Sequence, residues 1–200
     1  MNVVSFVVYR KNLPWATREH SDAVSLTMAL KHQSKRLSKL CLLDTKSRQE
    51  ALEWFGALAG LTLAIKKLSS PIVLIPIPNS DCVQNRSTIP RTLFLAESVA
   101  AHTANAVVCD CLRWKQHQTP SHCGGTRNIS RLNSDLLLTI TPPLATAILV
   151  DDVVTTGAHI IASAAVLARG GVYCNEAICV ASRSFSCLND SVFCVRQAAL

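Results

Sequence analysis

The clearest pattern of hydrophobic and polar positions lies between residues 147 and 171, which read AILVDDVVTTGAHIIASAAVLARGG. Residues 147–150 form an uninterrupted apolar run, as expected for a strand covered on both faces of a parallel sheet. Residues 159–169 are rich in Ala, Ile and Leu and are followed by Gly170 and Gly171, which predicts a helix with a glycine stop. The polar residues between the two runs therefore predict a turn that joins a strand to a helix.

The rest of the chain shows the same alternation of strand and helix patterns. Helices are expected over residues 21–31, 47–67 and 90–104. Strands are expected over residues 3–9, 72–75, 106–111 and 172–180. Residues 112–131 are polar and irregular, residues 134–140 are apolar but ambiguous, and the tail to residue 200 predicts no element. Such an alternation predicts an α/β fold, with a parallel twisted sheet flanked by helices.

Composition and charge narrow the class of protein. A chain of 200 residues suits one domain with a large core. Hydrophobic residues make up 49% of the chain and charged residues only 16%, which argues against disorder. The formal net charge of +7 favours an anionic partner, either a phosphorylated small molecule or nucleic acid. The alternative is that the extra Lys and Arg residues only solvate the surface.

The cysteines and the apolar stretches indicate in which cellular compartment the protein is expected. Nine irregularly spaced cysteines do not form a disulfide framework, so we expect a reducing compartment. Cys109, Cys111, His122 and Cys123 outline a zinc site, but their spacing does not fit a zinc finger or ribbon, and buried thiols are the alternative. The apolar stretch 3–8 is too short for a signal peptide and residues 54–65 are too few to span a bilayer, so we expect a soluble cytoplasmic protein.

The turn after residue 150 combines two kinds of polar group. Thr155, Thr156 and Gly157 place hydroxyls and free backbone N–H groups at a helix N-terminus, where a phosphate is favoured. Asp151 and Asp152 repel phosphate and suit sugar hydroxyls or a hydrated magnesium ion. Together these groups predict a site for a ribose 5-phosphate. The alternative is structural: two acids that end a strand and threonines that cap a helix.

The segment LVDDVVTTG resembles the phosphoribosyl pyrophosphate (PRPP) signature of the type I phosphoribosyltransferases. In that family the acidic pair holds the ribose hydroxyls and the Thr-Thr-Gly turn holds the 5-phosphate. The resemblance implies catalytic roles for Asp151 and Asp152, and a Mg²⁺ cofactor held through PRPP and not directly by the protein. It implies PRPP binding by Asp151, Asp152, Val153, Val154, Thr155, Thr156 and Gly157.

The same resemblance assigns two further segments. Pro76, Ile77, Pro78 and Asn79 occupy the place of the family's pyrophosphate loop, although they also fit a proline-rich strand exit. Residues 112–131 match the mobile loop that closes over PRPP in the family. There, Arg113 or Lys115 would contact pyrophosphate as a cation near the leaving group, and the alternative is that both are exposed loop charges.

Within the family, the order ALKH, IPIP, helix, Arg-rich loop and LVDDVVTTG is similar to the competence protein F (ComF) branch, over residues 29–182. Two departures stand out. The N-terminal zinc ribbon of that branch is absent from this sequence, and the expected Arg-Gly-Phe-Asn-Gln segment reads STIPR at residues 87–91. The resemblance implies one type I phosphoribosyltransferase-like (Rossmann-like) domain over residues 1–200. Residues 71–182 would be its core and residues 1–70 a small N-terminal hood.

The resemblance also implies a function in nucleotide metabolism. A glycosyltransferase of this kind transfers phosphoribose from PRPP to an acceptor, with a nucleobase as one candidate. The alternative is a non-catalytic PRPP or nucleotide sensor linked to DNA uptake or DNA metabolism, whose partners would include nucleic acid or DNA-handling proteins. The sequence names no acceptor and leaves the oligomeric state open, with a homodimer as one option.

Overall fold

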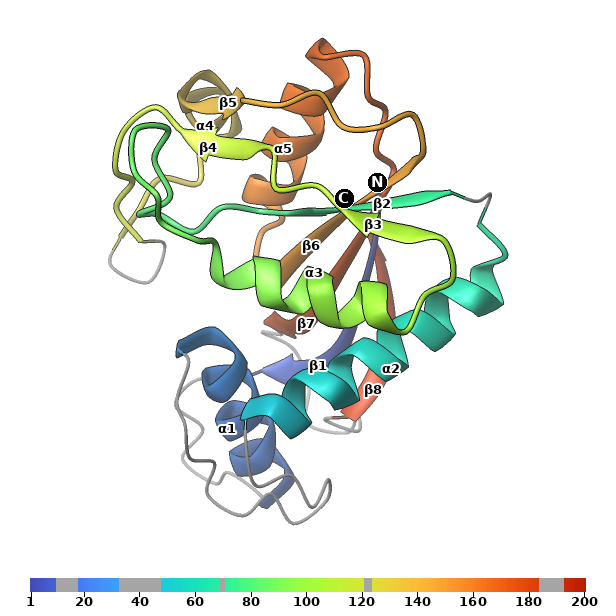
Figure 1. Ribbon diagram of the computed structural model, residues 1–200. Coiled ribbons are helices and arrows are strands. Elements are labelled where there is room, and N and C mark those ends of the chain that lie inside the picture. Colours follow the sequence, from blue (N-terminus) through green and yellow to red (C-terminus); the bar gives the residue numbers. More distant parts are fainter. Residues whose placement is uncertain (10–17, 33–47, 69–70, 121–123, 184–192) are drawn as a thin grey trace.

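The computed structural model describes residues 1–9, 18–32, 48–68, 71–120, 124–183 and 193–200. Its centre is a six-stranded sheet with the strand order β3-β2-β6-β7-β1-β8 (Figure 1). The strands are β1 (Asn2–Tyr9), β2 (Ile72–Pro76), β3 (Ala106–Val108), β6 (Thr146–Val154), β7 (Glu176–Arg183) and β8 (Phe193–Ala199). All neighbours pair in parallel except β8, which runs antiparallel to β1 at one edge. The chain is therefore α/β with a mostly parallel sheet, as the sequence predicts.

Helices cover both faces of this sheet. The helices are α1 (Arg18–His32), α2 (Arg48–Lys66), α3 (Arg91–Ala101), α4 (Ile129–Asp135) and α5 (Ala158–Arg169). α1, α2 and α3 pack on one face, and α5 packs on the other (Figure 1). On the α5 side a small antiparallel sheet of β4 (Leu112–Trp114) and β5 (Leu136–Leu138) adds a second layer. Among the described residues, no helix combines the length and apolar character needed to cross a bilayer.

The buried strands explain why their sequences are apolar without interruption. Successive side chains of a strand point to opposite faces. In β6, Ile148 and Val150 join the core beneath α1–α3, whereas Ala147 and Leu149 join the core beneath α5. β2 divides in the same way between the two cores. The part of a strand that has helices on both faces has no solvated side, so residues 147–150 of β6 and 72–75 of β2 are all hydrophobic.

The structure corrects several of the predicted elements. β6 does not end at residue 150 but runs to Val154, because β7 continues to pair with it after β2 has ended. Residues 112–131 are not wholly irregular, since they contain β4 and the start of α4. The C-terminal tail, for which no element was predicted, contains the edge strand β8. In each case pairing with a distant strand or packing on a distant helix stabilises a segment whose own pattern is weak.

Residues 1–70 contribute to the sheet as well as to its surroundings. β1 lies inside the sheet between β7 and β8, so this part of the chain is not only a set of helices. α1 and α2 lie on the same face of the sheet as α3. The role of these helices as a hood over a ligand stays a prediction.

The close packing of α2 on α3 yields a first testable prediction. A Cβ atom at Gly60 would lie 2.4 Å from the carbonyl oxygen of His102, and one at Gly56 would lie 2.4 Å from that of Ser98. We expect Gly60→Ala to lower the free energy of unfolding by about 1–3 kcal/mol, because overpacking against backbone outweighs the higher helix propensity of alanine. Urea denaturation measures this, with Ala57→Ser on the exposed side of α2 as the matched control. Equal free energies of unfolding for Gly60→Ala and the parent protein would contradict the close packing of α2 on α3 at this position.

Candidate functional site

A cleft of about 710 Å³ opens at the carboxyl ends of the central strands. Open α/β sheets bind ligands at this edge. Three predicted segments meet there: the acidic pair, the Thr-Thr-Gly turn and the turn that follows β2. Its lining includes Thr27, Met28, Ile77, Pro78, Asn79, Ser80, Asp81, Arg91, Thr92, Trp114, His117, Gln118, Thr119, Pro120, Arg127, Asp151, Asp152, Val153, Thr155, His159 and Arg183. Residues as far apart in sequence as Thr27 and Arg183, which are 156 positions apart, thus line one cleft.

The acidic pair lies in the part of β6 that continues past the end of the neighbouring strand β2. The last paired residue of β2 is Pro76, opposite Val150, so Asp151 and Asp152 extend beyond β2. Both side chains are partly exposed and line the cleft. Asp151 Oδ1 accepts a hydrogen bond from the Asp152 N–H at 2.8 Å, and Asp152 Oδ1 accepts one from the Val153 N–H at 2.6 Å. The backbone therefore holds both carboxylates, and carboxylate oxygens accept hydrogen bonds from hydroxyl donors.

The Thr-Thr-Gly turn lies beside a smaller pocket that adjoins the cleft. Gly157 is the N-cap of α5 with a φ of 73°, which glycine adopts without strain. Thr155 and Thr156 are exposed, and the Thr156 hydroxyl accepts the Ala158 N–H at 3.4 Å. The pocket is lined by this turn, by the first residues of α5 and by Arg127. Backbone donors of a helix N-terminus beside an arginine suit a phosphate group.

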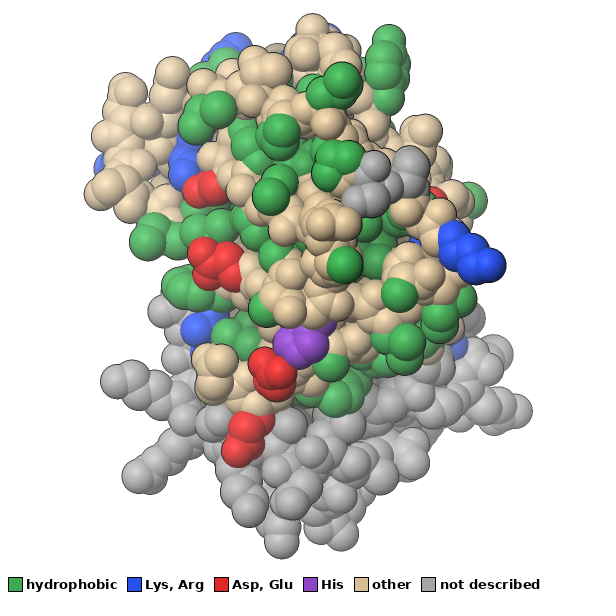
Figure 2. Space-filling view, turned by 45° about the vertical axis from the view of Figure 1, so that its right-hand side comes forward, with side chains coloured by type: hydrophobic (Ala, Val, Ile, Leu, Met, Phe, Trp, Pro, Cys, Tyr) green, Lys and Arg blue, Asp and Glu red, His purple; other side chains and the backbone are tan. Residues whose placement is uncertain are grey.

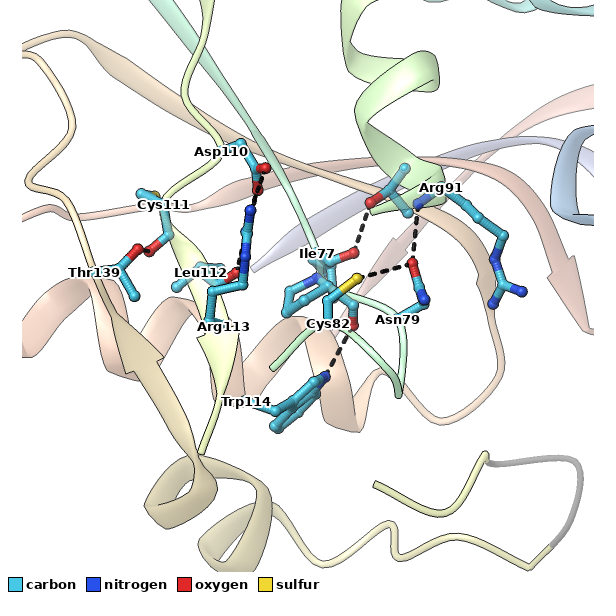
Figure 3. A network of polar contacts seen from close by, with 12 residues as sticks. Ile77, Asn79, Cys82, Arg91, Asp110, Cys111, Leu112, Arg113, Trp114 and Thr139 are labelled. Carbon is cyan, nitrogen blue, oxygen red and sulfur yellow. Dashed lines mark hydrogen bonds and ion pairs between the residues drawn. The ribbon is translucent and has the colours of Figure 1, made fainter. Parts of the chain in front are cut away.

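The turn after β2 is firmly held (Figure 3). The Ile77 N–H donates to the Val150 carbonyl at 2.9 Å, which ties this turn to the strand that carries the acidic pair. The Thr92 hydroxyl donates to the Ile77 carbonyl at 2.6 Å, and the Arg91 N–H donates to Asn79 Oδ1 at 2.9 Å. These bonds fix the start of α3 against the turn. Of the predicted pyrophosphate loop, Ile77, Pro78 and Asn79 line the cleft, whereas Pro76 is buried in β2.

The two cations predicted to reach pyrophosphate lie elsewhere. Arg113 is in β4 and not in a loop, and its guanidinium forms a two-bonded ion pair with Asp110 at 2.5 and 2.6 Å. The carboxylate raises the pKa of Arg113, first through its hydrogen bonds and then through its charge. The Lys115 side chain is exposed, and the backbone N–H of Lys115 donates to the backbone carbonyl of Asp135 at 2.8 Å. Neither residue lines the cleft.

Other residues take their place at the cleft. Arg127, from the same polar stretch, lines both the cleft and the smaller pocket. Arg91 and His159 were not singled out in the sequence, although each stands at the start of a helix that follows a predicted ligand-binding turn. Position at the end of such a turn is the signal that would have found them. On the face shown in Figure 2, Lys and Arg side chains lie apart from one another and form no basic patch among the described residues.

His159 connects the site to the second layer. Its ring meets that of Trp114 edge-on, with the centroids 5.8 Å apart. The Trp114 Nε1–H donates to the Pro78 carbonyl at 3.2 Å, so one stack links α5, β4 and the turn after β2. Burial lowers the pKa of His159, while the nearby negative charge of Asp152 acts in the opposite direction. The imidazole is therefore held mainly in its neutral form.

This lowered pKa makes stability depend on pH. The unfolded chain binds a proton at His159 more readily than the folded protein does, so folding loses stability as the pH falls through the ordinary histidine range. We expect the parent protein to lose more stability than His159→Gln between pH 8 and pH 5. Urea denaturation at both pH values measures this, with the exposed His117→Gln as control. An identical loss in parent and His159→Gln would show that His159 does not titrate differently on folding.

The described cysteines are not arranged as a zinc site. Cys111 is buried and Cys109 is half-buried, and burial raises the pKa of both thiols. His122 and Cys123 lie outside the described residues. Within the part of the chain that the structure describes, no three His, Cys, Asp or Glu side chains converge as metal ligands. The buried-thiol alternative accounts for Cys109 and Cys111.

Comparison with known proteins adds no assignment. No protein-family model matches the chain, and no curated protein matches it significantly.

Proposed function

We propose that the protein binds PRPP with Mg²⁺ and transfers its phosphoribosyl group to a small-molecule acceptor. The observation that carries this proposal is that one cavity system contains a phosphate-type turn, a carboxylate pair and the turn after β2. In it, residues 155–157 would hold the 5-phosphate and the acidic pair would hold the ribose hydroxyls. A ligand with a phosphate at one end and a diol beside it matches this order of groups.

The chemistry of such a transfer suits the residues at the cleft. Displacement of pyrophosphate builds positive charge on the ribose ring, so fixed negative charge near the ring favours the transition state. Asp151 and Asp152, held by backbone N–H groups, would supply that charge and orient the diol. Anchoring of the turn after β2 to β6 would keep the leaving group aligned with the ring.

The donor set fits a magnesium ion that is shared with the ligand. Mg²⁺ in proteins is bound by one or two carboxylates together with substrate phosphates and water. Among the described residues no third carboxylate, His or Cys converges with Asp151 and Asp152. The ion would therefore take most of its ligands from PRPP and water, and its role would be to neutralise charge on the leaving pyrophosphate.

The experiment that tests the proposal measures binding and turnover separately. Calorimetry in magnesium should detect PRPP binding to the purified protein. A screen for pyrophosphate release from PRPP, across nucleobases and small amines, should then identify an acceptor. Absence of PRPP binding would reject the proposal.

The segment at residues 87–91 favours a second candidate, a PRPP sensor of ComF type without transferase activity. It reads STIPR where the resemblance leads us to expect Arg-Gly-Phe-Asn-Gln, and it directly precedes and begins α3 at the cleft. A sensor should bind PRPP but release no pyrophosphate with any acceptor. Nucleic acid or a DNA-handling protein would then be its partner, and direct nucleic-acid binding should weaken steeply with salt.

A further inference from the structure

Arg91 lies on the wall of the cleft opposite the Thr-Thr-Gly turn. It is the first residue of α3, which packs on one face of the sheet, whereas the turn precedes α5 on the other face. Asp151 and Asp152, in the part of β6 that runs past the end of β2, line the cleft between these two walls. The cleft thus has a cation on one side, a phosphate-type turn on the other, and the acidic pair between them.

The guanidinium of Arg91 is available to a ligand. Its Nε atom is buried and has no hydrogen-bond partner, and none of the ion pairs found among the described residues includes it. In Figure 3 the side chain extends past Asn79 and makes no marked bond through its guanidinium. The carboxylate of Asp81, on the same wall, accepts a hydrogen bond from the Asn79 amide.

The side chain, and not the end of the helix, is the recognition group. The backbone N–H of Arg91 already donates a hydrogen bond to Asn79 Oδ1 at 2.9 Å, and this bond also holds the residue in place. A guanidinium stays charged at every physiological pH and presents a planar fork of donors. A buried donor without an acceptor is costly, and an oxyanion with two oxygens would satisfy it.

From this arrangement we propose that Arg91 forms a second anion site in the cleft, which binds a phosphoryl or carboxylate group. The proposal rests on the proposed function, in which residues 155–157 hold the 5-phosphate. The second anion would be either the pyrophosphate of PRPP or a carboxylate on the acceptor. In both cases the cleft selects a ligand, or a pair of ligands, with negative charge at both ends of a diol.

Calorimetry with two anions identifies the source. Magnesium pyrophosphate and malonate are titrated into the parent protein, Arg91→Gln, Arg91→Lys and the control Arg86→Gln, whose exposed arginine does not line the cleft. We expect Arg91→Gln to weaken binding of one of the two anions at least tenfold, Arg91→Lys to weaken it less, and Arg86→Gln to leave it within twofold. If Arg91→Gln weakens the binding of pyrophosphate, the second anion is the pyrophosphate of PRPP. If it weakens the binding of malonate, the second anion is a carboxylate on the acceptor. If neither anion binds, or if both bind Arg91→Gln as they bind the parent, the second site is overturned.

Ribose 5-phosphate separates this proposal from the proposed function. It carries the phosphate and the diol but no second anion, so Arg91→Gln should bind it as tightly as the parent protein does. Binding of ribose 5-phosphate by both proteins, with no effect of Arg91 on either anion, would leave the proposed function standing and remove the second site. Loss of ribose 5-phosphate binding in Arg91→Gln, with an unchanged thermal unfolding curve, would show that Arg91 belongs to the first site and would also reject the proposal.

Discussion

The double variant Asp151→Asn, Asp152→Asn is expected to bind PRPP at least about 100-fold more weakly than the parent protein. Hydrogen bonds to a charged acceptor contribute about 1.5–3 kcal/mol each, and about 1.4 kcal/mol corresponds to a factor of ten in affinity. In the proposed site, loss of the two negative charges weakens both hydrogen bonds to the diol. Calorimetric titration of PRPP in magnesium measures the change.

The choice of asparagine keeps the fold intact in this experiment. Each carboxylate accepts a hydrogen bond from the N–H of the next residue, and the amide oxygen of asparagine can still accept it. Asp135→Asn, at the end of α4 and away from the cleft, is the matched control and should bind PRPP as the parent does. Unchanged affinity in the double variant would show that the acidic pair does not hold the ligand.

Replacement of Trp114 by alanine is expected to lower the free energy of unfolding by about 3–5 kcal/mol, the range for truncation of a large buried aromatic side chain. Trp114 is 1% exposed and belongs to the core beneath α5. Its backbone N–H donates to the Cys82 carbonyl at 2.9 Å, and its indole N–H donates to the Pro78 carbonyl. Urea denaturation followed by far-UV circular dichroism measures the loss, because removal of a tryptophan alters fluorescence directly.

A second substitution separates packing from the hydrogen bond. Trp114→Phe keeps most of the apolar volume but leaves the Pro78 carbonyl without its donor, so we expect a loss of about 1–3 kcal/mol. A loss below about 1 kcal/mol for Trp114→Ala would mean that the layer of β4 and β5 does not pack on α5 as described. In that case the turn after β2 would also lack its support from β4.

The sequence predicts the central part of this fold well because that part follows local rules. Residues 147–150 and 72–75 are apolar at every position, which indicates strands buried on both faces, and both lie in neighbouring strands of the sheet. α2 and α5 were predicted to within about a residue at each end, since long amphipathic or apolar helices have a strong periodic signal. The short edge strand β3 was predicted within residues 106–111, whereas β4, β5 and the edge strand β8 were not predicted. β4 and β5 have only three residues each, and β8 pairs with a strand almost 200 residues away.

The candidate site divides in the same way. Asp151, Asp152, Thr155 and Gly157 were predicted together because they lie within seven residues of the sequence, at the end of β6 and in the turn that follows it. Arg113 and Lys115 were predicted from their positive charge and from the resemblance, which places the family's mobile loop in this polar stretch. The charge of a side chain does not determine which way it points. Arg113 pairs with Asp110, whereas Arg127, twelve residues after Lys115, lines the cleft.

The sequence by itself determined the α/β class, the strand-turn-helix unit and the polar groups that this unit presents, because each depends on residues close together in the chain. Only the tertiary structure decided which distant residues share the cleft with that unit. β2 lies next to β6, so the turn after β2 and Arg91 at the start of α3 line the same cleft as the acidic pair, although about 60 to 75 residues separate them in sequence. Strand order depends on the packing of all helices and strands at once, and no local pattern of residues encodes it.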